Sequence, residues 1–227
     1  MADRKESPAI CRQYGIPFGE PRFRHVVLFA RVPRFGTVKS RLARDIGKLA
    51  AYRFYRETLA QVSGRLARDG RWQLWIALTP DRLVRAGDVG PLRYGGGGWP
   101  DGAVLIPQGD GDLGTRMTRC LRALPPGPAV IVGSDIPEVA PDDLEEAFQM
   151  LGRKDAVFGP APDGGYWLVG LRRSRPVPCG FMQQVRWSTA HALEDTVAGL
   201  APEMTVGLLG HRDDIDDGEA YRLWRRR

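Results

Sequence analysis

HVVLFARVPRFGTVKSRL, residues 25–42, decides the architecture of this chain. Its first six residues, 25–30, form a short apolar run that predicts a buried strand. A loop rich in proline, glycine and basic residues follows over 31–40, and a helix is expected to begin at the end of that loop. A strand that leads through a polar loop into a helix is the repeating unit of an α/β fold.

Downstream of this stretch, apolar segments continue to alternate with helical patterns. A spacing of three and four residues predicts one face of an amphipathic helix for Tyr52, Tyr55, Leu59, Val62 and Leu66. Further strands are expected over 72–78, 104–107, 128–132, 156–158, 166–171 and 205–209. Further helices are expected from Leu113, from Pro141, over 188–200 and over 219–226. This alternation predicts a mostly parallel sheet covered by helices on both faces, in one domain that spans 25–227.

The composition is that of an ordinary globular protein, with 43% apolar and 26% charged residues among 227. No apolar run approaches the ~18 residues that a membrane span needs, and no secretory signal pattern opens the chain, so a cytoplasmic protein is expected. Residues 1–24 are polar and broken by proline and glycine, and we expect them to form a flexible extension. The three scattered cysteines predict neither a disulfide framework nor a cysteine-based zinc site.

The net charge of +6 fits attraction to phosphates, although a high arginine usage throughout the genome is the simpler alternative. All but four of the 33 basic residues are arginines, and they are spread along the chain rather than gathered in a stripe with aromatic residues. This distribution argues against nucleic acid as a partner.

In open sheets of parallel strands, ligands bind beyond the carboxyl ends of the strands, so the polar loops after the strands are where a site is expected. The loop after the first strand carries Arg31, Arg34, Lys39 and Arg41. Their positive charges, together with backbone N–H groups at the start of a helix, suit a polyphosphate. The spacing of a Walker A loop is absent. A solvated basic loop is the alternative interpretation.

Three further loops carry acids. Asp135 follows the strand 128–132 in the segment GSDIP, where its carboxylate could ligate Mg²⁺ beside phosphates or cap the next turn. The acid cluster 213–217, DDIDD, could belong to a site or cap the last helix. The segment 159–166, GPAPDGGY, permits close backbone approach to a ligand, although a plain turn is the simpler interpretation. A structural role is expected for the histidines, which lack metal-ligand spacing: His25, His191 and His211.

Five segments together are more specific than any one of them. They are FARVPRFGTVKSRL (29–42), QGDGDLGTRM (108–117), VIVGSDIP (130–137), GPAPDGGYWLVGL (159–171) and VRWST (185–189). In their order and spacing the chain resembles a bacterial family of the glycosyltransferase-A, or nucleotide-diphospho-sugar transferase, superfamily. The resemblance covers about residues 25–221. The segment KSRL and the loop around Asp135 are also similar to those of the 2-phospho-lactate guanylyltransferases.

This resemblance implies a Rossmann-like, mostly parallel seven-stranded sheet with helices on both faces and a donor nucleotide over its amino-terminal half. Asp135 matches the metal-binding Asp of the relatives, with Mg²⁺ or Mn²⁺ as the implied cofactor. Asp214 and Asp216 match a late Asp-x-Asp segment that would complete the metal site, although Asp217-Gly218 replaces the Thr-Pro that follows it in the family.

The expected site residues fall into three groups on this basis. The nucleotide-binding group is Ala30, Arg31, Gly36, Lys39, Arg41, Gln108, Asp112, Arg116 and Ser134. The acceptor-binding group is Asp163, Gly164, Gly165, Tyr166 and Trp187. Catalytic roles are expected for Lys39, Arg41 and Asp135.

Two reactions fit these expectations, each with a nucleotide donor and a small-molecule acceptor. In nucleotidyl transfer, an acceptor phosphate or hydroxyl attacks the α-phosphorus of a nucleoside triphosphate and pyrophosphate leaves. In glycosyl transfer, the same metal would stabilise a departing nucleoside diphosphate. The single Asp of GSDIP slightly favours nucleotidyl transfer, whereas the superfamily favours glycosyl transfer. A nucleotide-binding module without turnover is the third alternative.

Overall fold

Seven strands form one sheet in the order β3-β2-β1-β4-β6-β5-β7 in the computed structural model, which describes residues 13, 24–92 and 98–226. Within these residues, β6 runs antiparallel to its neighbours β4 and β5, and every other pairing is parallel. The expected fold class, an α/β domain with a mostly parallel seven-stranded sheet, is therefore confirmed.

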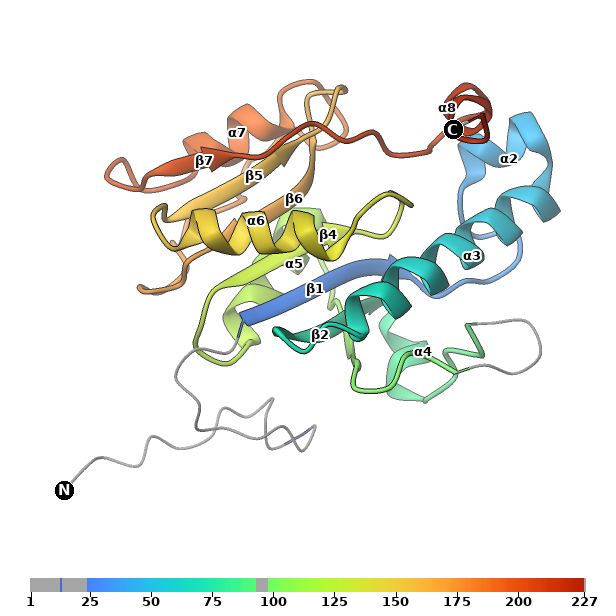
Figure 1. Ribbon diagram of the computed structural model, residues 1–227, viewed down its shortest axis with the longest axis horizontal. Helices are drawn as coiled ribbons and strands as arrows, with labels where there is room; N and C mark the ends of the chain where they lie inside the picture. Colours follow the sequence, from blue (N-terminus) through green and yellow to red (C-terminus); the bar gives the residue numbers. More distant parts are fainter. Residues whose placement is uncertain (1–12, 14–23, 93–97, 227) are drawn as a thin grey trace.

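Helices and strands alternate along the chain, as Figure 1 shows. The strands are β1 (Arg24–Arg31), β2 (Trp72–Thr79), β3 (Val104–Pro107), β4 (Ala129–Gly133), β5 (Ala156–Pro160), β6 (Tyr166–Leu171) and β7 (Val206–Leu208). The helices are α2 (Ser40–Ile46), α3 (Lys48–Ala67), α4 (Asp81–Arg85), α5 (Leu113–Ala123), α6 (Pro141–Leu151), α7 (Ala192–Ala198) and α8 (Gly218–Trp224).

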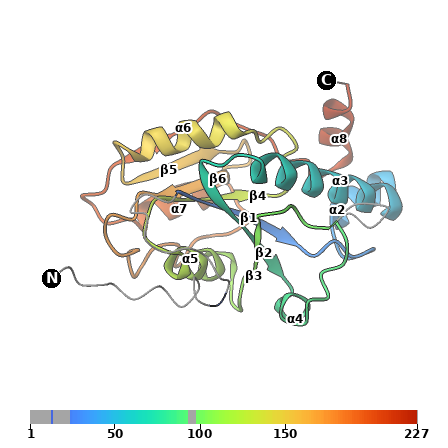
Figure 2. The same ribbon diagram turned by 60° about the horizontal axis from the view of Figure 1, so that its bottom comes forward.

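The strand β1 shows why both faces of the sheet need helices. Val26 and Leu28 pack with apolar residues of α3 and α6 on one face, and Val27 packs with those of α5 and α7 on the other. Figure 2 shows α3 and α6 on the side of the sheet opposite α5. Because successive side chains of a strand point to opposite faces, a strand that is buried on both faces is apolar throughout, as HVVLFA is.

The last helix closes one end of the molecule against the first two. In α3, the ring of Phe54 lies 5.3 Å, centroid to centroid, from the rings of both Tyr221 and Trp224 in α8. Leu42 of α2 and Ile215 are buried in the same cluster. This packing holds the segment before α8 beside the start of α2, although the two are far apart in the sequence (Figure 1).

Several elements differ from expectation. The helix expected after the first loop is two helices, because Gly47 between α2 and α3 has a φ of 87° that a helix does not allow. The helix expected over 188–200 begins only at Ala192, since Ser188 adopts the left-handed region with a φ of 61°. The short helix α4 was not expected. Within the described residues, no helix combines the length and apolarity needed to cross a membrane.

A further expectation, the flexible extension 1–24, falls largely outside the described residues. Arg24, the last residue assigned to that extension, is the first residue of β1.

His25 lies in the core, where its Nδ1 accepts a 3.2 Å hydrogen bond from Trp75 Nε1. Burial, reinforced by the nearby positive charge of Arg173, lowers the pKa of His25 to about 4. In the unfolded chain the pKa returns to about 6.5. The unfolded state therefore binds a proton first as the pH falls, and the free energy of unfolding that His25 contributes above pH 6.5 is lost on the way down to pH 4.

We expect the free energy of unfolding of the wild type to fall by about 2 kcal/mol more between pH 7.5 and pH 5 than that of His25→Gln. Glutamine can still accept the hydrogen bond from Trp75 but does not titrate. Urea unfolding at a series of pH values measures the difference. Parallel pH profiles for the two proteins would show that His25 is not the responsible group.

Candidate active site

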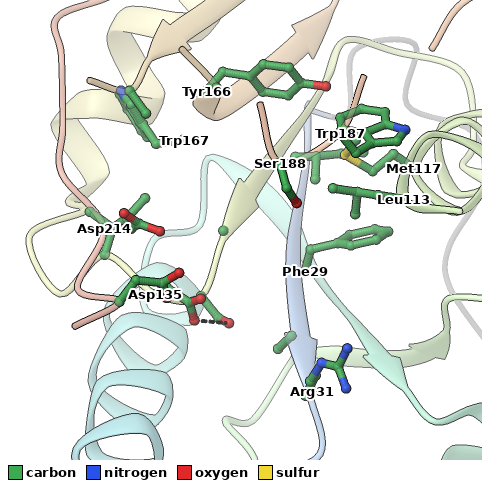
Figure 3. Close-up of a pocket in the computed structure, with 18 of the residues that line it drawn as sticks. Phe29, Arg31, Leu113, Met117, Asp135, Tyr166, Trp167, Trp187, Ser188 and Asp214 are labelled. Atoms are coloured by element: carbon green, nitrogen blue, oxygen red, sulfur yellow. Dashed lines mark hydrogen bonds between the residues drawn. The ribbon is translucent and has the colours of Figure 1, made fainter. Parts of the chain in front are cut away.

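A cavity of about 680 Å³ opens at the carboxyl ends of β1 and β4 (Figure 3). Besides these strand ends, its walls come from the loop before α2, the start of α5, the start of β6 and the segments 187–192 and 214–216. Ligand sites of open α/β sheets lie at this edge, and the volume is in the range of a small-molecule pocket. The cavity is therefore the candidate active site.

Lys39 joins the two ends of the chain in this cavity. Its Nζ lies 2.9 Å from Asp135 Oδ2 and 2.6 Å from Asp216 Oδ1, and only 4% of its side chain is exposed. Burial alone would lower the pKa of Lys39, but attraction to Asp135 and Asp216 outweighs burial and raises the pKa above its usual value. Lys39 is therefore a buried ammonium that keeps its charge at neutral pH.

The acids around Lys39 are held by backbone and hydroxyl contacts. Ser134 Oγ donates a 3.2 Å hydrogen bond to Asp135 Oδ1. The backbone N–H of Ile215, which lies between the two late acids, donates to the carbonyl oxygen of Asp135 at 3.3 Å. The cluster 213–217 divides its roles, because Asp217 instead caps α8 by accepting from two backbone N–H groups at 2.9 and 3.0 Å.

Asp214 faces Asp135 across the same end of the cavity (Figure 3). The pKa of Asp214 is raised to about 6, first by burial of its carboxyl group and then by the negative charge of Asp216. Lys39 opposes this shift, while Asp135 and Asp163 add to it. Asp214 thus lies where negative charges are concentrated.

The acids fit a divalent cation in their chemistry. Asp135 and Asp216 direct one oxygen each at Lys39 Nζ, so an ion could take the point between the two carboxylates only if the Lys39 ammonium moved away from it. Carboxylate oxygens are the ligands that Mg²⁺ and Mn²⁺ prefer. Within the described residues, no group of three or more acidic, histidine or cysteine side chains could enclose an ion. A bound ion would complete its shell with water and substrate phosphates, as Mg²⁺ commonly does.

Basic side chains line the cavity next to these acids. Arg41 is 70% exposed, and its Nη1 lies 3.7 Å from Asp216 Oδ2. Arg116 donates a 2.7 Å hydrogen bond from Nη1 to Gln108 Oε1, and burial together with the charge of Arg31 lowers the pKa of Arg116. Gln108 is itself buried and donates to the carbonyl oxygens of Ala30 and Ala77 at 3.0 and 2.8 Å. Gln108 therefore positions Arg116 rather than offering its amide to a ligand.

Tyr55 is a site residue that the sequence did not reveal. Its hydroxyl accepts from the backbone N–H of Arg31 at 2.8 Å and donates to the carbonyl oxygen of Arg31 at 3.0 Å. It also lies 3.4 Å from Ser134 Oγ. Burial, followed by the charge of Asp135, raises the pKa of Tyr55 well above its usual value. The helical spacing identified Tyr55 as a core residue, but only the fold shows that its hydroxyl ties the end of β1 to the loop that carries Asp135.

Aromatic side chains form the opposite end of the cavity. The rings of Tyr166 and Trp187 lie edge to face at 6.3 Å, and the ring of Trp167, the next residue of β6, lies on the side of Asp214 (Figure 3). The turn before β6 is closed by Asp163, whose Oδ1 accepts from the backbone N–H of Gly165 at 2.9 Å. The interpretation of this segment as a turn is therefore correct, and Asp163 and Gly165 line the cavity as well.

Gly164 contacts the protein rather than a ligand. It has a φ of 83°, and a Cβ at this position would lie 2.2 Å from the carbonyl oxygen of Ala190. Its carbonyl oxygen accepts from the backbone N–H of Leu193 at 3.0 Å. Gly164 therefore uses its lack of a side chain to contact Ala190, and this contact holds the segment 187–192 over the cavity.

That segment and its neighbours add lining residues that were not expected. Ser188 projects its hydroxyl into the cavity, and Phe29, Leu113 and Met117 form an apolar wall beside it (Figure 3). Met117 is otherwise buried in the core. Leu113 is 37% exposed, so its apolar side chain is available to a ligand.

Most of the expected site residues meet in this one cavity. Those that line it are Ala30, Arg31, Lys39, Arg41, Gln108, Arg116, Ser134, Asp135, Asp163, Gly165, Tyr166, Trp187, Asp214 and Asp216. Three do not line it: Gly36, which is in an exposed turn, Gly164, and Asp112, which caps α5 by accepting from Thr115 N at 2.7 Å.

The strand order, the lone antiparallel β6 of the described sheet and a polar cavity at the carboxyl ends of the strands define the class of protein. It has the nucleotide-diphospho-sugar transferase fold of the glycosyltransferase-A-like superfamily. The chain belongs to the family described as "Uncharacterized protein conserved in bacteria (DUF2064)", whose model matches residues 58–189. The bacterial family and the fold implied by the five sequence segments are thereby confirmed.

Solved structures carry the same fold. One, from Desulfovibrio desulfuricans G20, is described provisionally as a nucleotide-diphospho-sugar transferase; it is 24% identical, with a TM-score of 0.70 over 89% of this chain and 94% of its own. The 4-diphosphocytidyl-2C-methyl-D-erythritol synthase of Anaerococcus prevotii is 12% identical, with a TM-score of 0.54 over 92% of this chain and 100% of its own. Rv0371c of Mycobacterium tuberculosis, in complex with manganese, is 18% identical, with a TM-score of 0.52 over 92% and 100%. A search of curated proteins gives no significant match.

Proposed function

We propose that this protein is a metal-dependent nucleotidyltransferase, which moves a nucleoside monophosphate from a nucleoside triphosphate to a small acceptor. One observation carries the proposal. Four basic side chains line the cavity that also contains Asp135 and Asp216: Arg31, Lys39, Arg41 and Arg116. A nucleoside triphosphate carries roughly twice the negative charge of a nucleotide sugar, so this concentration of cations favours the triphosphate.

In the proposed reaction, an acceptor oxygen forms a bond to the α-phosphorus of the triphosphate. The bond from that phosphorus to the bridging oxygen breaks, its electron pair leaves with pyrophosphate, and the acceptor proton passes to solvent. Asp135 and Asp216 would hold Mg²⁺ or Mn²⁺, which neutralises phosphate charge when bound. Lys39, Arg41 and Arg116 would bind the triphosphate and stabilise the charge that develops on pyrophosphate. Tyr55 and Gln108 would keep Arg31 and Arg116 in position.

Two of the structures with this fold support the proposal by their names, since one is the synthase of a diphosphocytidyl compound and the other is in complex with manganese. Glycosyl transfer from a nucleotide sugar is the second candidate. It is favoured by the aromatic end of the cavity, because the rings of Tyr166 and Trp187 could stack on a sugar. The two reactions differ in their products, which are pyrophosphate and a nucleoside diphosphate.

A thermal-shift screen of the four nucleoside triphosphates and the common nucleotide sugars, with Mg²⁺ or Mn²⁺, tests the proposal without an acceptor. At ~100-fold over its Kd a ligand stabilises the fold by about 2.7 kcal/mol, which raises the melting temperature of a protein of this size by about 5–10 °C. We expect this shift with a triphosphate, GTP or CTP first. Melting-temperature shifts with nucleotide sugars alone would favour glycosyl transfer, and the absence of a shift with every nucleotide would contradict both reactions.

The helix α2 offers a matched pair of variants for the same assay. Arg41 and Arg44 are both exposed on α2, but only Arg41 lines the cavity. We expect Arg41→Ala to weaken triphosphate binding by about tenfold, as the loss of one charge-assisted contact does, while Arg44→Ala binds like the wild type. Equal affinities for the two variants would remove Arg41 from the nucleotide site.

A further inference from the structure

The two ends of the cavity differ in charge, and this difference bears on the acceptor. Among the described residues, the basic side chains that line the cavity are Arg31, Lys39, Arg41 and Arg116, all from the first loop region or α5. Figure 3 shows Arg31 at the end of the cavity remote from Tyr166. In the turn just before Tyr166 the charged lining residue is the carboxylate Asp163, whereas Asp214 lies on the side of Asp135.

The basic side chains nearest to this aromatic end are already paired. Arg186 donates two hydrogen bonds to the carboxylate of Asp195, at 2.7 and 2.8 Å. His191 Nδ1 lies 3.3 Å from Glu194 Oε2. Arg212 stacks over Trp167, 5.7 Å from the ring centroid, and is paired with Asp143 and Glu138. None of the three basic residues lines the cavity, so no cation of the described chain is placed to receive an acceptor phosphate there.

The same end offers apolar surface and hydroxyl groups instead. Tyr166 and Trp187 present rings, and Phe29 and Leu113 extend the apolar wall. Ser188 directs its hydroxyl into the space between this wall and the acids (Figure 3), and no hydrogen-bond partner is found for that hydroxyl within the described residues. Aromatic faces with nearby carboxylates and hydroxyls suit C–H surfaces and O–H groups.

The backbone is strained where it presents these groups. Met182, Gln184 and Ser188 all adopt left-handed conformations, with φ values of 61°, 58° and 61°. Left-handed conformations of residues other than glycine are uncommon and cluster at functional sites. Gly164 holds the same segment in place by its contact with Ala190. The aromatic end is therefore a built surface rather than an accidental gap between loops.

We propose that the acceptor is a hydroxyl compound that has an apolar face and carries no phosphate or other negative charge, the chemistry of an unphosphorylated sugar or cyclic polyol. The inference rests on the proposed function, because it takes the basic end of the cavity for the nucleotide. The acceptor hydroxyl then attacks the α-phosphorus, pyrophosphate leaves with the electron pair of the broken bond, and the proton passes to solvent. A phosphate ester at this end would place its charge near the carboxylate of Asp163, a like-charge contact that excludes wrong partners.

The test pairs hexoses and inositols with their own phosphate esters. Pyrophosphate release is measured with Mg²⁺ and the triphosphate that gives the largest thermal shift. We expect an unphosphorylated member to raise release at least roughly tenfold more than its ester, a ratio typical of one unfavourable charge contact. Equal or greater pyrophosphate release with the esters would overturn the inference. The inference would also be overturned if no unphosphorylated compound raised pyrophosphate release.

Two variants of one residue then locate the effect. Ser188→Lys adds a cation to the aromatic end, and Ser188→Met adds similar bulk without charge. We compare the ratio of pyrophosphate release with an unphosphorylated compound to release with its ester. We expect this ratio to be about tenfold lower in Ser188→Lys than in Ser188→Met. An unchanged ratio would place the acceptor elsewhere and overturn the inference. The thermal shift with nucleotide is measured separately on the same proteins. A missing shift would count against the proposed function. If the shift is present, the ratio between sugars and esters tests the acceptor inference alone.

Discussion

Replacing Asp135 by Asn is expected to lower metal-dependent turnover by about 10²- to 10³-fold while the protein stays folded. The carboxylate of Asp135 is one of two that converge on a single point at the carboxyl end of β4. Its charge would neutralise the metal and hold it beside the phosphates, a contribution of several kcal/mol in the transition state. Asn keeps the shape but loses the charge.

The fold should tolerate this change, because Lys39 keeps Asp216 as a partner at 2.6 Å. Circular dichroism and the melting temperature check folding, and electron paramagnetic resonance of free Mn²⁺ checks metal binding without reference to turnover. Asp142→Asn, in the first turn of α6 and outside the cavity lining, is the control and should behave as wild type. Activity of Asp135→Asn within a few-fold of wild type would rule out the metal role.

Replacing Lys39 by Met should weaken nucleotide binding and also destabilise the fold. Triphosphate binding should weaken by about 10²-fold, since a buried cation next to the phosphates is lost. Without nucleotide, Asp135 and Asp216 are left facing each other, and we expect a loss of about 1–2 kcal/mol of folding stability. Loss of one partner of a fully buried pair would cost about 3–5 kcal/mol, but water screens these carboxylates, which are 36% and 43% exposed.

Millimolar Mn²⁺ should then raise the melting temperature of Lys39→Met more than that of the wild type, because the point between the carboxylates becomes available to an ion. Lys48→Met, which replaces an exposed lysine at the start of α3, is the matched control and should show neither effect. A smaller Mn²⁺ response in Lys39→Met than in the wild type would mean that the two carboxylates do not share an ion.

The same geometry explains why the first and last loops of the domain act together. Lys39 and Asp216 are separated by 177 positions in the sequence and by one hydrogen bond in space. The packing of Phe54 against Tyr221 and Trp224 is the apolar contact that holds α8, and with it Asp216, at this place. Stability and function are thus coupled here, since loosening α8 would also displace an acid of the site.

The sequence by itself determined the alternation of strands and helices and the edge of the sheet where the site lies. The apolar run 25–30 is a local pattern that follows from burial of both faces of a strand. The helical spacing of Tyr55 and Leu59 is a local pattern that follows from burial of one face of a helix. Polar loops after strands pointed to Lys39 and Asp135, because the carboxyl ends of parallel strands share one edge. Local signals also misled at element boundaries, where Gly47 and Ser188 interrupt helices through backbone conformations that spacing does not reveal.

The tertiary structure alone decided which of these residues meet. A strand pattern shows which side chains share a face but not which strand is its neighbour, so the insertion of antiparallel β6 between β4 and β5 could not be read from the chain. That insertion brings Tyr166, the first residue of β6, to the same edge as the last residues of β1 and β4. Long-range packing likewise determines that Lys39 lies between Asp135 and Asp216 and that Gly164 contacts Ala190 rather than a ligand. These contacts depend on how segments that are distant in the sequence pack together, and the spacing of residues along the chain does not reveal that packing.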